Sequence, residues 1–278
     1  MLKISPDEIK IIAQYIYSIS GIALDEKKAY LFETRLNSLA QEEKCASYSQ
    51  LCMKAKADAS KKLERKIIDG MTTNETLFFR DSSPFEMFQF KILPDLIDKR
   101  YGNGSGSPTN LKIWSAACST GQEVYSIAIV LKELLPNQKD YKINLLGTDI
   151  SDAAIAQASY GHYNKFEIER GLAQEKLQKY FTPDGNSWKI RDDIRAMALF
   201  KKINLMQPFI GMDKFDVVFC RNVAIYFSLE DRKKLFEKIA NILNPDGYLV
   251  IGSTESLTGI CPLFEPKRHL RSVFYQLK

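Results

Sequence analysis

The segment Leu111–Ser126, LKIWSAACSTGQEVYS, constrains the fold more than any other part of the chain. It predicts a short apolar strand, a tight turn of small residues and then a helix that begins near Glu123. Small side chains in such a turn allow a ligand to lie against backbone N–H groups at the start of the helix. A second apolar segment, 143–147, leads to Asp149, and an acidic residue at the carboxyl end of a strand can accept both hydroxyl groups of a ribose. Together these segments predict a nucleoside-binding site.

From residue 111 onward, apolar strand patterns alternate with helical patterns. The predicted strands are 111–116, 143–149, about 199–204, 215–220 and 247–252, and the predicted helices are 122–135, 151–159 and 229–243. Such alternation is typical of a parallel sheet with helices on both faces. A last apolar run, 270–277, predicts a closing strand. A turn cluster, Pro183–Asn186, predicts a small antiparallel β-subdomain inserted at about 181–203.

The first part of the chain, residues 1–72, is predicted to be a separate all-helical domain, followed by a catalytic domain over 73–278. Ser5 is placed as the N-cap of the first helix, with proline at the next position and Glu8 completing a capping box. Gly21 is expected to end that helix.

Composition excludes several classes of protein. No stretch of about twenty apolar residues is present, so no membrane insertion is expected. The N-terminus has no signal-peptide pattern, which predicts a cytoplasmic protein.

The 5 cysteines show no C-x-x-C spacing and the 2 histidines are far apart, so neither a disulfide framework nor a metal site is predicted. A net charge of +5 is low for a nucleic-acid-binding chain of this size, and we expect no such partner.

Six segments, in this order, carry a resemblance to a known family: TNETLFFR, IWSAACSTGQEVYS, GTDIS, INL, FDVVFCRNVAIYF and LNPDGYLVIGSTES. The chain resembles the chemotaxis protein methyltransferases (CheR family), which methylate glutamate side chains of chemoreceptors with S-adenosylmethionine and release S-adenosylhomocysteine. The resemblance implies a class I S-adenosylmethionine-dependent methyltransferase fold. Such a fold is a Rossmann-like, doubly wound α/β sheet, here with the helical domain and the β-subdomain added.

The resemblance implies roles for five residues of the linker and the first two strands. Asn74, Thr76 and Arg80 match linker residues that close over the cofactor, and Arg80 suits the carboxylate of the cofactor. Glu123 matches the acid near the amino group of the cofactor. Asp149 matches the acid that holds the ribose.

Five further residues follow later strands. Asn204 and Leu205 match the pair that flanks the adenine. Arg221 and Asn222 match positions at the mouth of the site. Tyr226 matches the tyrosine that orients the substrate carboxylate.

The proposed chemistry needs little help from acids or bases. A glutamate carboxylate, with a pKa of about 4.3, is already ionised at neutral pH and can attack the methyl group directly. The enzyme gains by removing water and fixing the approach, and we expect Tyr226, Arg221 and Arg80 to be the catalytic residues. The methionine end of the cofactor carries both charges, so the site needs an acid, Glu123, and a fixed cation, which is either Arg80 or Arg221.

The helical domain carries candidate contacts with an acidic receptor helix. These are Arg35 and, in the basic run after it, Lys54, Lys61, Lys62 and Arg65. A solvated helix face is the alternative interpretation of such a run. The segment TPDGNSWKIR is shorter than the glycine-rich loop with which family members grip a tethering peptide of the receptor, which favours an enzyme independent of that peptide.

Two other functions remain open at this point. A methyltransferase of another substrate class, such as nucleic acid, commonly carries an Asn/Asp-Pro-Pro-aromatic tetrapeptide after the fourth strand, where this chain has CRNVAIYF. An inactive, cofactor-binding signalling scaffold is disfavoured by the presence of Arg221 and Tyr226.

Overall fold

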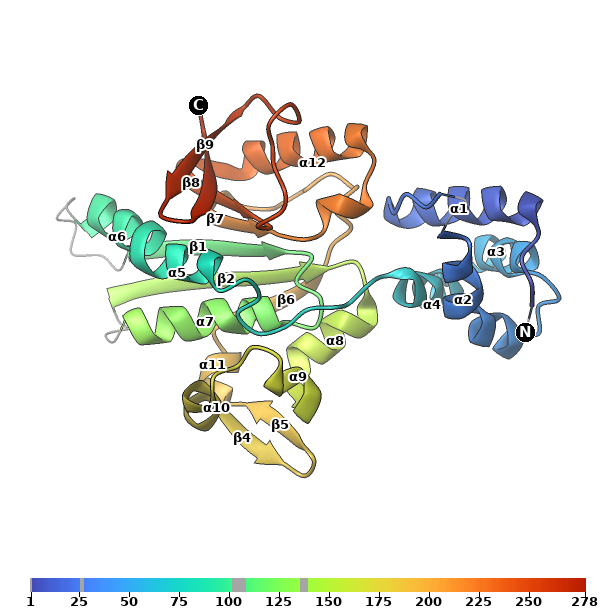
Figure 1. Cartoon of the computed structure of the whole chain (residues 1–278), viewed down its shortest axis with the longest axis horizontal. Coiled ribbons are helices and arrows are strands. Elements are labelled where there is room, and N and C mark those ends of the chain that lie inside the picture. The colour runs from blue at the N-terminus through green and yellow to red at the C-terminus, as the bar shows by residue number, and fades with distance from the viewer. Residues whose placement is uncertain (1, 26–27, 102–108, 136–139) are drawn as a thin grey trace.

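A computed structural model describes residues 2–25, 28–101, 109–135 and 140–278. Helices of the N-terminal part form one domain, and a larger α/β domain follows (Figure 1). The chain between them, from residue 72 to 82, contains no helix or strand and runs from the helical domain to the sheet. The structure therefore has the two-part organisation that the sequence predicts.

Four helices build the N-terminal domain: α1 (Pro6–Ser20), α2 (Tyr30–Glu42), α3 (Tyr48–Ala57) and α4 (Lys62–Met71). They share one apolar core, which includes the fully buried side chains of Ile12, Tyr48 and Ile67. The predicted start of α1 is confirmed, because Ser5 and Glu8 form the reciprocal hydrogen bonds of a capping box. Gly21 ends the helix with a φ of 76°, a conformation that glycine adopts without strain.

The main sheet has seven strands in the order β6-β2-β1-β7-β8-β10-β9. Their bounds are β1 (Thr109–Ala116), β2 (Tyr141–Asp149), β6 (Ala198–Lys202), β7 (Phe215–Cys220), β8 (Leu243–Ile251), β9 (Phe264–His269) and β10 (Ser272–Leu277). The five strands from β6 to β8 are parallel, as predicted. The predicted closing strand is β10, which pairs antiparallel with both β8 and β9. The apolar pattern missed β9 because its sequence, FEPKRH, is that of a polar edge strand.

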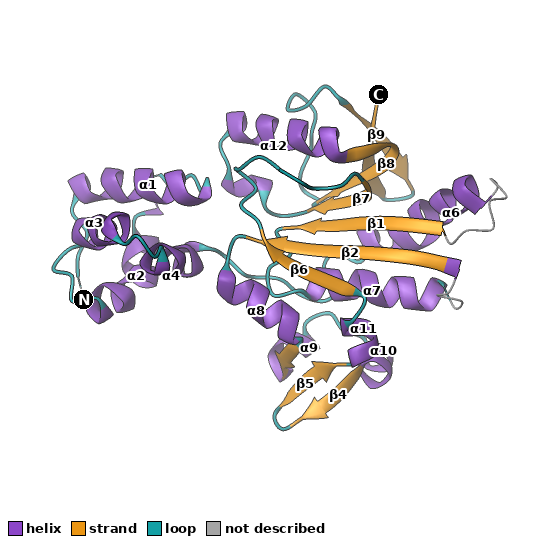
Figure 2. Cartoon of the chain, turned by 180° about the vertical axis from the view of Figure 1, so that it is seen from behind, coloured by secondary structure: helices purple, strands orange, loops and turns teal. Residues whose placement is uncertain are grey.

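Alternate side chains of the strands pack on opposite faces of the sheet. Ile113 contacts the core formed with α5 (Ser83–Met87), η2 (Phe88–Ile92), α6 (Leu93–Tyr101) and α7 (Gln122–Leu134). The next residue, Trp114, packs into the core formed with α12 (Leu229–Ile242). Figure 2 shows these two groups of helices on either side of the strands. The period of two along each strand thus places a helix layer on both faces.

A second, three-stranded antiparallel sheet lies beside the main one, in the order β3-β5-β4. Its strands are β3 (His162–Asn164), β4 (Phe181–Asp184) and β5 (Ser187–Ile190), and α8 (Asp152–Tyr160), α9 (Lys165–Glu169), α10 (Gln174–Tyr180) and α11 (Asp192–Arg195) accompany them. The hairpin at the predicted turn is present. The small sheet nevertheless begins before residue 181, because β3 belongs to it. The sequence did not predict β3 because this strand has too few residues to give a pattern. It also ends before 203, because β6 belongs to the main sheet.

The turn between β1 and α7 is held in place by a close approach at Gly121. This residue has a φ of 95°, and a Cβ added to it would lie 2.9 Å from the Cβ of Ala158 on α8 and 3.1 Å from the hydroxyl oxygen of Tyr163. Only glycine permits this conformation and this distance. The turn of small residues is therefore packed directly against the next helix of the domain.

We predict that Gly121→Ala lowers the free energy of unfolding by at least about 2 kcal/mol. The left-handed backbone accounts for about 1–2 kcal/mol of the loss. Crowding against α8 adds roughly 1–3 kcal/mol. Gly185→Ala is the matched control, because Gly185 has a φ of 58° and nothing lies within 4 Å of an added Cβ. Urea unfolding of both variants measures the difference, and equal losses would contradict the packing argument.

Candidate active site

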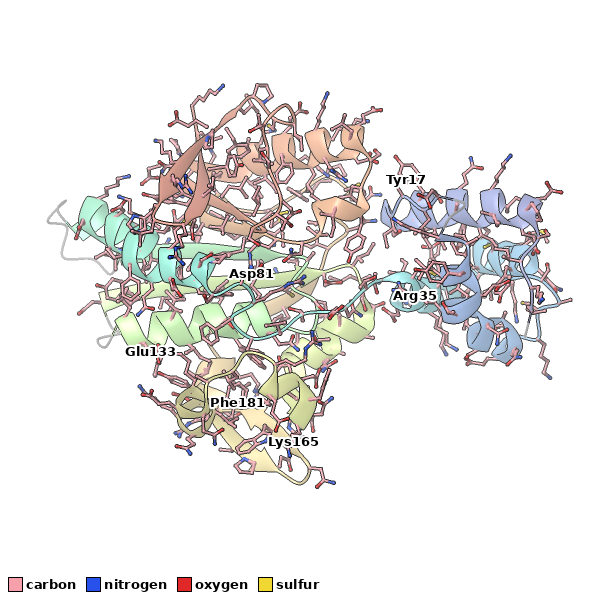
Figure 3. All side chains as sticks on the ribbon, in the orientation of Figure 1. Tyr17, Arg35, Asp81, Glu133, Lys165 and Phe181 are labelled. Atoms are coloured by element: carbon pink, nitrogen blue, oxygen red, sulfur yellow. The ribbon has the colours of Figure 1, made fainter. Side chains whose placement is uncertain are left out.

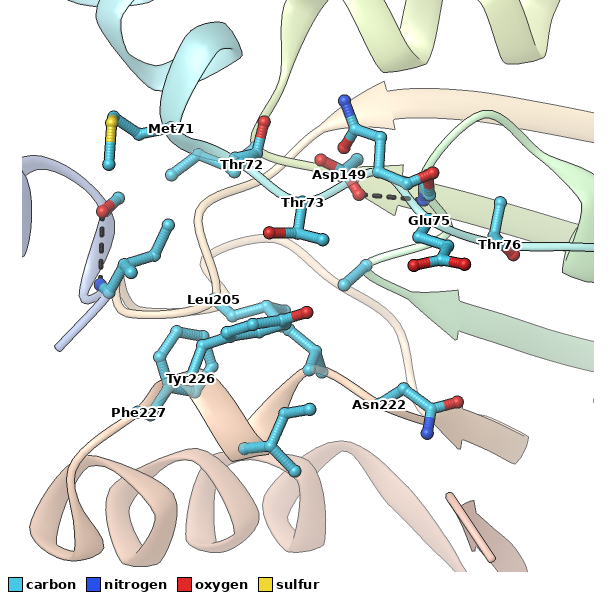
Figure 4. A pocket seen from close by; sticks show the side chains of 18 of the residues that line it. Met71, Thr72, Thr73, Glu75, Thr76, Asp149, Leu205, Asn222, Tyr226 and Phe227 are labelled. Atoms are coloured by element: carbon cyan, nitrogen blue, oxygen red, sulfur yellow. Dashed lines mark hydrogen bonds between the residues drawn. The ribbon is translucent and has the colours of Figure 1, made fainter. Parts of the chain in front are cut away.

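A cleft lies where the carboxyl ends of β1, β2 and β7 meet the linker and the helical domain (Figure 4). Its lining includes every residue predicted to bind the cofactor, together with Arg35 and Tyr226; the predicted set is Asn74, Thr76, Arg80, Glu123, Asp149, Asn204, Leu205, Arg221 and Asn222. Ligands bind at this edge of open parallel sheets. The structure thus brings together side chains that are up to 191 positions apart, from Arg35 to Tyr226.

Asp149, at the end of β2, is fixed by two backbone groups. The N–H of Ser119 donates to Oδ2 at 2.9 Å, and the N–H of Ser151 donates to Oδ1 at 2.9 Å. The carboxylate is only 7% exposed. Burial raises the pKa of Asp149, and the two backbone hydrogen bonds oppose that shift. Each oxygen keeps a lone pair, so an ionised Asp149 can still accept hydroxyl groups of a ligand.

Arg221, directly after β7, holds three segments together. Its Nη1 donates to Glu123 Oε2 at 2.9 Å, and its Nη2 lies 3.0 Å from Asp81 Oδ2. The same Nη2 donates to the carbonyl oxygen of Arg80 at 2.7 Å. The guanidinium carbon lies 5.4 Å from the ring centroid of Phe85, and the side chain is 2% exposed. Arg221 therefore ties the end of β7 to α7 and to the linker.

This arrangement bears on the choice of the cation for the cofactor carboxylate. The guanidinium of Arg221 is committed to Glu123 and Asp81. Arg80 lines the same cleft, and within the described part of the chain its guanidinium has one hydrogen-bond partner, the carbonyl oxygen of Glu75 at 3.1 Å. The geometry favours Arg80 over Arg221 for this role.

Asn204 and Leu205 follow β6 and reach the helical domain. The side chain of Asn204 donates to the carbonyl oxygen of Ile19 at 3.1 Å. Lys238 on α12 donates from Nζ to the carbonyl oxygens of Leu205 and Gln207. Burial lowers the pKa of Lys238. Sequence patterns did not single out Lys238, because the carbonyl groups that it contacts lie more than thirty positions earlier in the chain.

Tyr226 lies on the wall opposite Asp149, beside Leu205 (Figure 4). It closes the 3-10 helix η4 (Ala224–Tyr226), which follows β7 after a short turn. Its carbonyl oxygen accepts a hydrogen bond from the N–H of Ala23 at 2.9 Å. The helical domain thus contacts the backbone of the residue predicted to orient the substrate.

The five predicted receptor contacts separate into two groups. Arg35 lines the cleft and donates to the carbonyl oxygen of Met71 at 2.8 Å (Figure 3). The other four lie outside the cleft, on α3, α4 and the residue before α4: Lys54, Lys61, Lys62 and Arg65. Three of these four pair with carboxylates of this chain at 2.5, 3.1 and 3.6 Å. Of these five predicted contacts, only Arg35 lines the cleft.

Other classes of site are not seen in the described part of the chain. No group of three or more His, Cys, Asp or Glu side chains is arranged to hold a metal ion among the described residues. No described helix is both long and apolar enough to cross a membrane.

Comparison with known proteins gives matches over both domains. Residues 7–72 match the family domain described as "CheR methyltransferase, all-alpha domain", and residues 74–269 match "CheR methyltransferase, SAM binding domain". Chemotaxis protein methyltransferase Cher2 of Pseudomonas putida is 37% identical over 95% of both chains. A chemotaxis protein methyltransferase of Vibrio parahaemolyticus is 37% identical over 100% of this chain and 99% of its own. One from Borreliella burgdorferi is 34% identical over 93% and 91%.

Solved structures with a similar fold are more distant. A TehB-like SAM-dependent methyltransferase from Corynebacterium glutamicum has a TM-score of 0.36 and 16% identity, over 66% of this chain and 86% of that one. A likeness at this level adds nothing to the sequence matches.

We predict that the affinity for S-adenosylhomocysteine depends on pH through Asp149. Ribose hydroxyl groups donate to the ionised carboxylate, and burial raises the pKa of Asp149 above its ordinary value. The affinity should therefore be constant around neutral pH and fall as the pH drops through that raised pKa. Titration calorimetry at several pH values measures this dependence. Asp149→Asn should bind more weakly and lose the dependence, and a variant that keeps the wild-type slope would exclude Asp149 as its source.

Proposed function

The chain belongs to the CheR methyltransferase family, and we propose that it transfers the methyl group of S-adenosylmethionine to glutamate side chains of chemoreceptors. In this proposal residues 73–278 carry out the transfer, and residues 1–72 contact the cytoplasmic methylation helix of the receptor. The product is a glutamate methyl ester, formed in the cytoplasm during chemosensory adaptation. The observation that carries the proposal is one cleft that holds Asp149, Glu123 and Tyr226 together.

The donors and acceptors of the cleft fit S-adenosylmethionine. Asp149 offers a fixed carboxylate to the ribose, and Glu123 offers one to the ammonium group, with Ser115 Oγ donating to Glu123 Oε1 at 2.8 Å. Arg80 would pair with the carboxylate of the methionine end. When bound, the cofactor supplies an electrophilic methyl group, which a substrate carboxylate oxygen takes as the carbon–sulfur bond breaks.

The residues of the chain then act by positioning and by excluding water. Tyr226 would donate a hydrogen bond to one oxygen of the substrate glutamate and aim the other at the methyl group. The linker and the helical domain form one side of the cleft and reduce the access of water. No general base is required, because the substrate carboxylate is ionised at neutral pH.

Two cations on the helical-domain side of the cleft suit an acidic substrate. Arg35 and Lys28 of the helical domain both line the cleft. A glutamate entering from that side would meet two cations in the cleft that Tyr226 also lines, which favours its approach. The same residues would also meet a phosphate backbone, and the labelling experiment below separates the two substrates.

We predict that the enzyme transfers labelled methyl groups to membranes that contain chemoreceptors, and that alkali releases the label as methanol. Tyr226→Phe should lower kcat about tenfold or more, which corresponds to about 1.4 kcal/mol of lost transition-state stabilisation. Its affinity for S-adenosylmethionine should stay at the wild-type value, because the hydroxyl group contacts the substrate.

Tyr160→Phe, at an exposed tyrosine of α8, is the matched control and should keep wild-type turnover. Alkali-stable label, or label in RNA, would overturn the assignment to glutamate. Cofactor binding without any transfer would favour the scaffold.

We further propose that the enzyme does not need a tethering peptide. A peptide could be held as an added strand on the open edge of β4, and Pro183 opposes this. Pro183 lies opposite Trp188 of β5. Because proline has no N–H, these two residues cannot form the hydrogen-bonded kind of antiparallel pair. The backbone groups of Pro183 therefore point away from β5, to the open edge of β4. An added strand would lack a donor at that position.

Removal of the C-terminal tail of the receptor should therefore leave the rate of methylation unchanged. Initial rates with full-length and truncated receptor, at equal receptor concentration, test this expectation. A free peptide with the sequence of the tail should also fail to bind in calorimetry. Slower methylation of the truncated receptor, together with binding of the peptide, would show that the tail is used.

A further inference from the structure

Glu255 lies in the turn after β8 and contacts the backbone of two neighbouring segments. Its Oε2 accepts hydrogen bonds from the N–H of Asn222 at 2.7 Å and from the N–H of Gly252 at 2.8 Å. Asn222 follows β7, whereas Gly252 follows β8, and these strands are neighbours in the sheet. One carboxylate oxygen therefore joins the ends of two adjacent strands at the edge where the cleft lies.

The contact between Glu255 and the backbone of Gly252 leaves no room for a side chain at position 252. A Cβ on Gly252 would lie 2.4 Å from Glu255 Oε2, so only glycine allows the carboxylate to come this near. The other oxygen, Oε1, is buried and has no hydrogen-bond partner among the described residues. A buried acceptor without a partner lowers the free energy of unfolding. The unpaired Oε1 therefore indicates that Glu255 has a role other than stabilising the fold.

The residue that Glu255 holds has an unusual backbone. Asn222 has a φ of 57°, in the left-handed region, which glycine and, less often, asparagine adopt. Its conformation directs the chain from the end of β7 into η4, which ends at Tyr226. A hydrogen bond to the N–H of Asn222 fixes the peptide at the start of this short turn.

The same turn also reaches the linker. Ser253 Oγ donates to Asp81 Oδ2 at 3.3 Å, and Asp81 in turn pairs with Arg221. Glu255 thus contacts the segment 221–226 directly, whereas Ser253 is linked to it through Asp81 and Arg221. Neither side chain lines the cleft.

We propose that Glu255 is a positioning residue for methyl transfer, which sets the place of Tyr226 by holding the backbone of Asn222. The proposal rests on the proposed function in so far as Tyr226 orients the substrate. Glu255 contacts neither cofactor nor substrate in this account. It acts as a hydrogen-bond acceptor rather than through its charge, so glutamine at this position can serve.

The test compares Glu255→Ala and Glu255→Gln with the wild-type enzyme. The control is Glu237→Ala, because Glu237 is an exposed carboxylate on α12. Three quantities are measured: hydrogen exchange of the Asn222 amide, the affinity for S-adenosylhomocysteine, and kcat and KM with receptor membranes.

Loss of one such hydrogen bond changes an equilibrium constant or a rate about tenfold. In Glu255→Ala, the Asn222 amide should exchange about tenfold faster and kcat should fall about tenfold. The affinity for S-adenosylhomocysteine and the KM for the receptor should change less than about threefold, because the contacts of Asp149 and Glu123 remain. Glu255→Gln should recover most of kcat and of the protection of Asn222. Glu237→Ala should match the wild type.

Several results would overturn the proposal. These are wild-type kcat in Glu255→Ala, unchanged exchange at Asn222, a parallel loss of product affinity, or glutamine performing no better than alanine. A wild-type enzyme that binds S-adenosylhomocysteine but labels no receptor overturns the proposed function instead. In that case faster exchange at Asn222 in Glu255→Ala, with rescue in Glu255→Gln, still supports the hold of Glu255 on the backbone of Asn222.

Discussion

The buried guanidinium of Arg221 is the group on which the cleft depends. It pairs with Glu123 at the start of α7 and with Asp81 of the linker, and both contacts lie within 3.0 Å. Removing it would leave the carboxylate of Glu123, 12% exposed, without its cation, which is strongly destabilising for a buried pair. The position of the linker and the orientation of Glu123 are therefore set together. One side chain, Arg221, thus fixes both the linker and Glu123 at the cleft.

The helical domain completes the cleft through backbone contacts. The carbonyl oxygen of Ile19 accepts from Asn204, and the N–H of Ala23 donates to the carbonyl oxygen of Tyr226. Such contacts depend on the course of the chain after α1, and Gly21 redirects the chain at that point with its left-handed backbone. The N-terminal domain is thus part of the wall of the cleft as well as a candidate surface for the receptor.

The sequence predicts the strand, turn and helix around Glu123 and the first helix with its cap, because these are set by local periodicity and capping chemistry. The family pattern names residues that the structure gathers in one cleft. Local patterns could not predict β3, which is too short, or β9, which is polar. They also could not reveal the contacts of Lys238 and Glu255, which join segments more than thirty positions apart. Such pairs depend on the order of strands in the sheet.

We propose that this cleft binds S-adenosylmethionine with Arg80 as the cation for its carboxylate and with Arg221 paired to Glu123 and Asp81. A crystal structure of the enzyme with S-adenosylhomocysteine tests it most directly. We expect the ribose on Asp149, the adenine between Asn204 and Leu205, and the ligand carboxylate on Arg80, with the pair of Arg221 and Glu123 intact. A ligand bound elsewhere, or a carboxylate that draws Arg221 away from its partners, would contradict the account.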